Sequence, residues 1–256
     1  MKVARIRCCE VRELSDDERA EIQRGVVAIF LGSFEFEDTQ MFARRVIFRS
    51  PDSKLTLLYA ERGELIAFFA MNITRVELDG RRHAVIHASG YSHPELRGAG
   101  TYAVRRLLTH ALRFKLREPF TPLCLIGEAS TPAGYARMAR HFPLLHPRRG
   151  VEPPPELTRL VTEVARERGF FPLEGDPWRV ELGHPLRFRD PERLRRYAEG
   201  SAEDSVAFYL ERNPGYLDNQ WLVIYCAFDR AQLGAALRRE LSRRLSRTRG
   251  RRAPAS

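Results

Sequence analysis

The sequence predicts an α/β protein in which helices flank a mostly antiparallel sheet. Residues 54–60, 65–78 and 81–89 are consecutive runs of strand-favouring residues separated by short turns, which is typical of an antiparallel meander. Residues 104–112 then carry apolar side chains at helical spacing, and a short apolar run follows at residues 123–127. Strands and helices that follow one another in this way predict a layered α/β domain.

The N-terminal part of the chain supplies one strand and two helices. Residues 3–12 alternate loosely between apolar and polar side chains, which predicts a strand. Ser15 and Glu18 form a capping box, so a helix begins there and runs to about Leu31. A second helix is expected over residues 39–48.

Turn residues and proline place the next elements. Gly63 lies in the turn between the first two strands of the meander, and Asp79 and Gly80 form a hairpin turn before the third. After the apolar run, Pro132 stands in the first turn of a helix expected over residues 133–142. These elements account for about the first 147 residues.

The pattern changes in the C-terminal part. Residues 147–155 form a proline-rich, basic connector, and residues 156–168 carry one apolar helical face. Residues 178–182 and 221–228 are candidate strands, separated by an inserted, partly helical segment at residues 185–215. The sequence leaves open whether this insertion covers a binding site or packs on the outside.

Composition limits the class of protein. The chain has 256 residues, of which 43% are hydrophobic, so it can bury a full core as one domain with an extension. Its four cysteines, including the adjacent Cys8 and Cys9, match neither a disulfide framework nor a zinc spacing, which favours a reducing compartment. Because no apolar run is long enough to span a membrane and no signal-peptide core is present, we expect a soluble, cytoplasmic protein without a metal site.

Most of the formal net charge of +10 lies at the C-terminus. Residues 238–252 contain eight arginines and one acid, Glu240. Such a tail can bind RNA, anionic lipid or an acidic partner, or it can serve only to raise solubility. No aromatic residues interleave with the arginines as a base-stacking surface would need, so nucleic acid is expected only through this tail, if at all.

The most informative segment is the glycine-containing loop at residues 92–102. Gly98 and Gly100 permit a tight turn with backbone N–H groups directed at one point, and the following helix adds the positive end of its dipole. A diphosphate would fit such a loop. The segment lacks the Gly-Lys-Ser or Gly-Lys-Thr of a Walker A loop and the third glycine of the dinucleotide fingerprint, and a simple strand-to-helix turn is the alternative.

This loop resembles the acyl-coenzyme A loop of the GCN5-related N-acetyltransferase superfamily. The family pattern is Arg or Gln, two residues, Gly, one residue, then Gly or Ala; Arg97 and Gly100 match it, whereas Tyr102 stands where the family has a small residue. The element order, one strand, two helices, three strands, helix, strand and helix, is also the family's. The resemblance implies a mixed, mostly antiparallel central sheet and acetyl-CoA or another acyl-CoA as co-substrate. The implied donor-binding residues are Ser92, Arg97, Gly98, Ala99, Gly100, Thr101 and Tyr102.

The resemblance also implies a division of the chain and a course for the donor. It covers residues 1–147 as the acyltransferase core, with residues 148–237 as an extension that completes the sheet and residues 238–256 as a basic tail. In the family the pantetheine arm lies between the fourth and fifth strands, and backbone amides of the fourth serve the thioester carbonyl. The matching positions are residues 89–92.

Three side chains are candidates for proton transfer. Glu128, directly after the predicted fifth strand, is the preferred base, because burial at the rim of the sheet raises a carboxyl pKa; capping the helix near Thr131 is an equal alternative. Tyr135 is a candidate general acid or a packing residue, since counting along the helix puts Arg137 where the family's tyrosine usually stands. His87 is either a proton relay or a hydrogen-bonded core residue.

The acceptor side is marked by an acidic and aromatic cluster between the first two helices. It consists of Phe34, Glu35, Phe36, Glu37 and Asp38, in a segment that borders the acceptor site in the resembling family. Carboxylates beside aromatic rings suit a cationic amine, and they equally suit a solvated loop that leads into a helix.

By this resemblance the chain is an acyl-CoA-dependent N-acyltransferase. It would move an acetyl or other acyl group to a small-molecule or peptide amine by direct attack in a ternary complex. One alternative is a transferase of the same fold that takes its donor from aminoacyl-tRNA or an acyl carrier protein. Another is a non-catalytic interaction module in which Tyr102 blocks the donor site.

Overall fold

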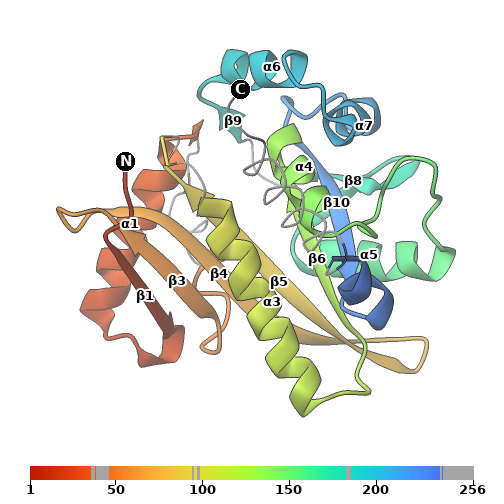
Figure 1. The fold of residues 1–256 in the computed structure, drawn as a ribbon, viewed down its shortest axis with the longest axis horizontal. Coiled ribbons are helices and arrows are strands. Elements are labelled where there is room, and N and C mark those ends of the chain that lie inside the picture. The colour runs from red at the N-terminus through yellow and green to blue at the C-terminus, as the bar shows by residue number, and fades with distance from the viewer. Residues whose placement is uncertain are drawn as a thin grey trace, which may run out of the picture.

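Among the residues that the computed structural model describes, eight strands form one mostly antiparallel sheet (Figure 1). The described residues are 1–35, 38, 46–93, 95–96, 99–182, 186–236 and 238. The strands, in their order across the sheet, are β1 (Arg5–Glu10), β3 (Lys54–Tyr59), β4 (Leu65–Leu78), β5 (Arg81–Ser92), β6 (Leu123–Ala129), β10 (Gln220–Ala227), β8 (Asp176–Leu182) and β7 (Phe170–Leu173).

Helices lie on both faces of this sheet. The described ones are α1 (Asp16–Leu31), α3 (Ala99–Arg117), α4 (Pro132–His141), α5 (Pro155–Glu167), α6 (Pro191–Glu199) and α7 (Asp204–Arg212), with a short 3-10 turn η1 (Val11–Glu13). A small second sheet pairs β2 (Phe34–Glu35) with β9 (Arg187–Phe188).

The strand order confirms the predicted fold class. β5 and β6 are parallel neighbours joined through α3, and the other neighbouring pairs of the described sheet are antiparallel. The C-terminal part of the chain adds β10 next to β6 and β8 outside β10. β7, which closes that edge, is a strand that the sequence pattern did not predict.

Alternation along each strand directs apolar side chains to both faces of the sheet, and the described buried residues form three clusters. On β6, Cys124 and Ile126 face the core that contains buried residues of α1 and α5. Leu123 and Leu125 face the opposite core, which contains buried residues of α3, α4 and α7. The sheet is therefore covered by helices on both faces.

Local signals in the sequence set several boundaries as predicted. The Ser15 side chain accepts from the Glu18 N–H, and the Glu18 side chain returns a bond to the Ser15 N–H, so the capping box opens α1. Asp79 and Gly80, with φ of 51° and 71°, form the hairpin turn between β4 and β5. Both residues adopt the left-handed conformation that such a turn requires.

Other boundaries differ from the predictions because tertiary pairing extends the elements. β5 continues to Ser92 through its pairing with β4, and β6 continues to Ala129 through its pairing with β10. Glu128 therefore lies within β6, not after it. Residues 39–45 of the second predicted helix lie outside the described residues. Among the described residues, no helix combines the length and the hydrophobicity that crossing a bilayer requires.

Candidate functional site

The two central strands, β5 and β6, part in the middle of the sheet. They pair only over Ala84–Ile86 and Leu123–Leu125, although both strands continue well beyond this point. Past it, β5 stays paired with β4 and β6 stays paired with β10. Backbone groups that would otherwise link β5 to β6 therefore face the space between the two strands.

Alternation along β5 selects which amides face this parting. Ala84 donates its N–H to the carbonyl of Pro122, on the β6 side, at 2.8 Å. Every second residue after Ala84 is directed to the same side, because the pairing of β5 with β4 has no break in register. Of the predicted positions 89–92, this selects the N–H groups of Gly90 and Ser92.

The first turn of α3 holds a glycine under an arginine side chain. A Cβ added to Gly100 would lie 2.5 Å from Cδ and 2.6 Å from Nη1 of Arg137, a residue of α4. The guanidinium of Arg137 therefore lies over the start of α3, where the helix dipole favours an anion. Glycine at residue 100 gives that side chain the room to cross.

Tyr102 points away from the sheet. Its side chain is 38% exposed and shares the outer side of α3 with Leu112, which is 58% exposed. This exposure fits a ring that does not fill the loop, and donor binding by the loop stays a prediction. Arg97 and Gly98 lie outside the described residues, as do the side chains of Ala99 and Thr101.

Glu128 is held by an arginine that sequence reasoning missed. Arg168, directly after α5, donates through Nη1 to the Glu128 carboxylate and through Nη2 to the carbonyl of Ile126 at 2.8 Å. The exposed fractions of the Arg168 and Glu128 side chains are 5% and 9%. Glu128 does not cap α4, because the Thr131 hydroxyl accepts from the Gly134 N–H and fills that role.

The Ile126 carbonyl shows where the guanidinium lies. Tyr225 of β10 exchanges both of its backbone hydrogen bonds with His146, on the side away from β6, so it forms a non-hydrogen-bonded pair with Ile126. The Ile126 carbonyl must then face β5. The Arg168 guanidinium therefore donates to a backbone carbonyl at the parting of β5 and β6. If the two strands stayed paired there, a backbone N–H of β5 would be the donor instead.

Burial and the ion pair act on Glu128 in opposite directions. Burial raises the pKa of the Glu128 carboxyl, while the positive charge of Arg49 lowers it. Burial also lowers the pKa of the Arg168 guanidinium, but a guanidinium keeps its proton in proteins. The contact with Arg168 therefore favours the ionised carboxylate, and we expect an ionic pair at neutral pH.

His87 lies one residue beyond Ile86, the last residue of β5 that pairs with β6. Its Nε2 is 2.5 Å from the Thr74 hydroxyl, and its buried Nδ1 has no hydrogen-bond partner among the described residues. Alternation places it on the same face of the sheet as Val85 and Tyr91. The hydrogen bond to Thr74 fits a histidine that belongs to the core. Because Nδ1 has no partner among the described residues, a role as proton relay stays a prediction.

Tyr135 is committed to the core on the opposite face. Its hydroxyl donates to the carbonyl of Pro147 at 2.7 Å, and its ring centroid lies 5.7 Å from those of Phe208 and Tyr209. Burial raises the pKa of its phenol. A hydroxyl that already donates to a backbone carbonyl fits the packing alternative, and a role as general acid stays a prediction.

Aromatic rings connect the segment after α1 to the face that carries Glu128. The Phe34 ring lies 4.6 Å from Phe30, 5.0 Å from Phe188 and 5.7 Å from Tyr91, measured between centroids. Burial and, to a smaller extent, the charge of Glu128 raise the pKa of Tyr91. Phe34 is thus a core residue, and Tyr91 is a neighbour of Glu128 that sequence reasoning missed.

The acidic part of the predicted acceptor cluster is only partly described. Glu35 pairs in register with Arg187 of β9, which brings the inserted segment beside the end of α1. Phe36 and Glu37 lie outside the described residues, and Asp38 is described. Binding of an amine acceptor by this cluster stays a prediction.

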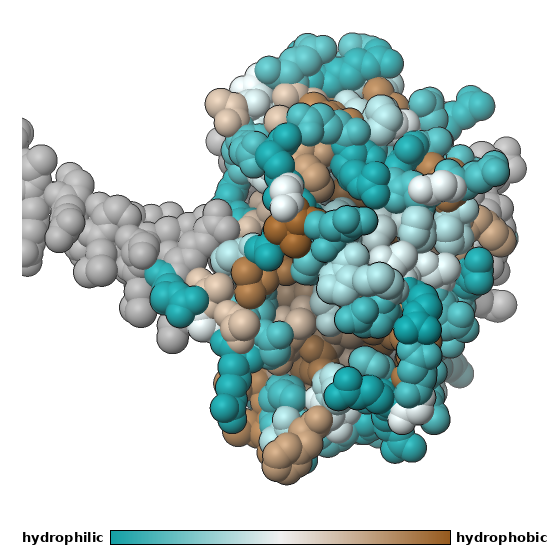
Figure 2. Space-filling model, turned by 90° about the vertical axis from the view of Figure 1, so that its right-hand side faces the viewer, coloured by the Kyte–Doolittle hydropathy of each residue, from teal (hydrophilic) through white to brown (hydrophobic). Residues whose placement is uncertain are grey.

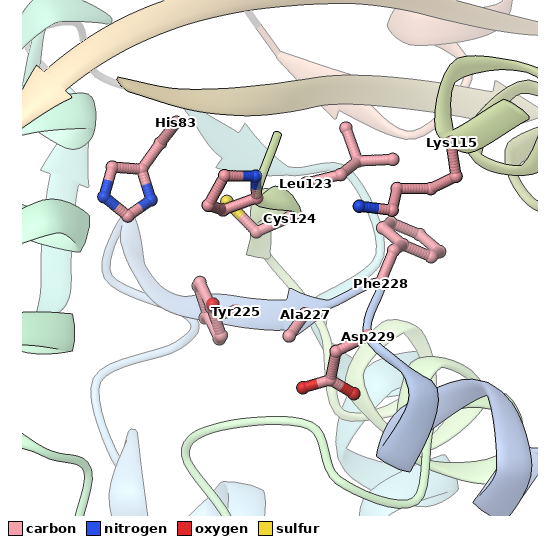
Figure 3. Close-up of a pocket in the computed structure, with 9 residues that line it drawn as sticks. His83, Lys115, Leu123, Cys124, Tyr225, Ala227, Phe228 and Asp229 are labelled. Atoms are coloured by element: carbon pink, nitrogen blue, oxygen red, sulfur yellow. The ribbon is translucent and has the colours of Figure 1, made fainter. Parts of the chain in front are cut away.

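A small pocket lies at the other end of the sheet, where β6 begins and β10 ends. It has a volume of about 190 Å³, and its wall includes Lys115 and Asp229 (Figure 3). Lys115 donates to the carbonyls of Pro119 and Thr121, and Asp229 accepts from the Gln232 N–H, so both charged groups are already bonded. Among the described residues, no group of three metal-ligating side chains comes together.

Comparison with known proteins finds similarity only at the level of structure. No family model and no curated protein sequence matches the chain. Among solved structures, 54 chains match. A probable N-acyltransferase from Enterococcus faecalis is 16% identical, with a TM-score of 0.36, and the match covers 54% of this chain but only 32% of that one.

Two further matches cover more of the compared protein. A GCN5-related N-acetyltransferase from Kribbella flavida is 13% identical, with 86% of this chain and 96% of that chain covered and a TM-score of 0.34. An acyl-CoA N-acyltransferase from Pseudomonas aeruginosa is 16% identical, with 48% and 77% covered and a TM-score of 0.32. The solved structures that this chain is similar to thus include GCN5-related N-acetyltransferases, and the likeness to each is partial.

Proposed function

We propose that this chain is an acyl-CoA-dependent N-acyltransferase that transfers an acetyl or other acyl group to an amine by direct attack in a ternary complex. The observation that carries the proposal is the parting of β5 and β6, together with the start of α3 soon after β5 in the chain. That arrangement gives a thioester donor free strand amides at one end and a helix N-terminus at the other.

The residues on the donor side fit an acyl-CoA. Because residue 100 is glycine, the Arg137 side chain can cross the first turn of α3, where its positive charge would bind a phosphate group. The N–H groups of Gly90 and Ser92 face the parting, where they would donate to a carbonyl oxygen that gains negative charge. The bound acyl-CoA would supply an activated thioester.

On the acceptor side, Glu128 is the group that we propose takes up the amine proton, directly or through water. Arg168 fixes the orientation of this carboxylate and holds it ionised, which a proton acceptor requires. His87, with its unpartnered Nδ1, is the candidate relay. The acceptor would be a small-molecule or peptide amine, and Tyr91 would lie beside it.

Isothermal titration with acetyl-CoA tests the donor site. We expect saturable binding that Gly100→Glu abolishes, because the new side chain would collide with Arg137 and repel phosphate. Gly234→Glu is the matched control, since a Cβ there meets only Arg238 Nη1 at 3.8 Å. No heat from the native chain, or equal loss in both variants, would overturn the donor site.

Release of the free CoA thiol in the presence of a panel of primary amines tests the catalytic assignment. Glu128→Gln should lower the rate by about 10²- to 10⁴-fold, the range for loss of a general base. Glu152→Gln, at an exposed position of the connector, is the control and should leave the rate unchanged. An unchanged rate in Glu128→Gln would remove Glu128 as the base without affecting the donor site.

Two alternatives make different predictions. A donor carried by tRNA or a carrier protein requires the basic tail, so removing residues 238–256 would abolish transfer from those donors only. A non-catalytic module would not bind acetyl-CoA. The outward position of Tyr102 supports the enzyme over this second alternative.

A further inference from the structure

The outer side of the C-terminal half of α3 exposes an unusual row of apolar side chains. Leu112 and Leu116, one helical turn apart, are 58% and 75% exposed, and Phe120, just after the helix, is 96% exposed. We call these three residues the α3 stripe. A space-filling view from the side shows hydrophobic surface at the lower left, toward the layer that holds α3 (Figure 2).

The α3 stripe lies in a strongly cationic setting. α3 contains five cationic side chains and no aspartate or glutamate; the cations are Arg105, Arg106, Arg113, Lys115 and Arg117. Among the described residues, none of these four arginines forms an ion pair, and the nearby acid Glu118 is engaged by both terminal nitrogens of Arg75, at 2.8 and 2.5 Å. Within the described part of the chain, these arginines therefore carry positive charge without an ion-pairing acid.

We propose that the α3 stripe and its flanking arginines dock this protein on an anionic lipid surface. Leucine and phenylalanine on one side of a helix, bordered by arginines, are the composition of helices that lie in the membrane interface. The apolar side chains would enter the boundary of headgroups and acyl chains, while the guanidinium groups would stay with the lipid phosphates. This role goes beyond acyl transfer and does not depend on it.

The shape of the surface favours lipid over a protein partner. A stable protein interface engages about 20 to 30 residues on each side. The α3 stripe is a single helix edge on the outer layer of the molecule, and Phe120 extends beyond the end of the helix (Figure 1). A lipid surface needs only shallow insertion of a few such side chains together with attraction of the cations.

Docking at the α3 stripe would leave the proposed donor site open. Gly100 and Leu112 are separated by about 18 Å along the helix, at about 1.5 Å per residue. The start of α3, where Arg137 crosses Gly100, is thus at the far end from Phe120. The surface and the donor site can therefore be tested independently.

Co-sedimentation of the full chain with lipid vesicles tests the proposal. We expect binding to vesicles of phosphatidylcholine and phosphatidylglycerol at 3:1, little binding to pure phosphatidylcholine, and weakening as salt is raised. The triple variant Leu112→Ser, Leu116→Ser, Phe120→Ser should lower the partition coefficient at least about tenfold, since each buried apolar side chain contributes to insertion.

Matched variants distinguish binding through the α3 stripe from binding through the basic tail, because every protein in the assay keeps the tail. Phe171→Ser, at an exposed aromatic residue of β7, should leave vesicle binding unchanged, and Arg113→Glu with Arg117→Glu should lower it as strongly as the triple variant. Circular dichroism should show the native fold in each, because all of these side chains are on the surface. Unchanged binding by the triple variant, absence of binding to anionic vesicles, or preferential binding to RNA or to an acidic protein would overturn the proposal.

Discussion

Replacing Arg168 by methionine should leave the Glu128 carboxylate buried without its partner. The variant keeps the aliphatic bulk of the side chain but removes the bond to Glu128 and the bond to the Ile126 carbonyl. Burial then keeps the pKa of the Glu128 carboxyl above its ordinary value of 4.5. The carboxyl must therefore take up a proton on folding at neutral pH.

The magnitude follows from this difference between folded and unfolded chains. Each pH unit between the two pKa values changes the free energy of unfolding by about 1.4 kcal/mol. A group whose folded-state pKa is raised binds more protons in the folded state, so stability falls as the pH rises above the ordinary carboxyl pKa of 4.5. At pH 7, Arg168→Met should cost about 3 kcal/mol, in line with the usual cost of breaking a buried pair.

Urea unfolding followed by the fluorescence of Trp178 and Trp221 measures this cost. Arg168→Met should lose stability between pH 5 and pH 7.5 much more steeply than the native chain. Adding Glu128→Gln to this variant should recover most of the loss at pH 7, because no buried charge is left. A loss below about 1 kcal/mol with no added pH dependence would refute the ion pair as the element that holds Glu128.

Three further substitutions test individual contacts. Tyr135→Phe should lower the free energy of unfolding by about 1 kcal/mol through the lost hydrogen bond to Pro147, measured by thermal unfolding. The pH profile of acyl transfer should not change. Loss of the basic limb of that profile would restore Tyr135 as the general acid. Gly90→Ala should lower the free energy of unfolding by about 1 to 3 kcal/mol, because its Cβ would come 2.2 Å from the Phe69 ring. If the variant is as stable as the native chain, the ring can move aside. Thr131→Ala should cost about 1 kcal/mol through loss of the α4 cap, with Thr131→Ser restoring it; equal stability of the alanine and serine variants would contradict the cap.

Much of the fold was predictable because its signals are local. The capping box at Ser15, the hairpin turn at Gly80 and the proline that opens α4 act on neighbouring residues through backbone geometry. The apolar periodicity of α3 and the apolar run of β6 likewise follow from which face each element buries. The predicted α/β class with a mostly antiparallel sheet was therefore confirmed.

The candidate site could be predicted only in part. Residues near the glycine loop were identified because a loop of that type has a local pattern, yet the position of Arg137 over Gly100 depends on how α4 packs. The ends of β5 and β6 were placed too early, because pairing with β4 and β10 extends both strands. Glu128 was consequently expected outside the strand that holds it.

The sequence by itself determined where the chain turns, which segments have one apolar face, and where a glycine loop opens a helix. Tertiary structure alone decided that Arg168, forty residues away from Glu128 in the chain, meets it where β5 and β6 part. A capping residue or a turn acts over one helical turn, so its effect is written in adjacent positions. A buried ion pair depends on which faces of distant elements the packing of the sheet brings together, and no local pattern carries that information.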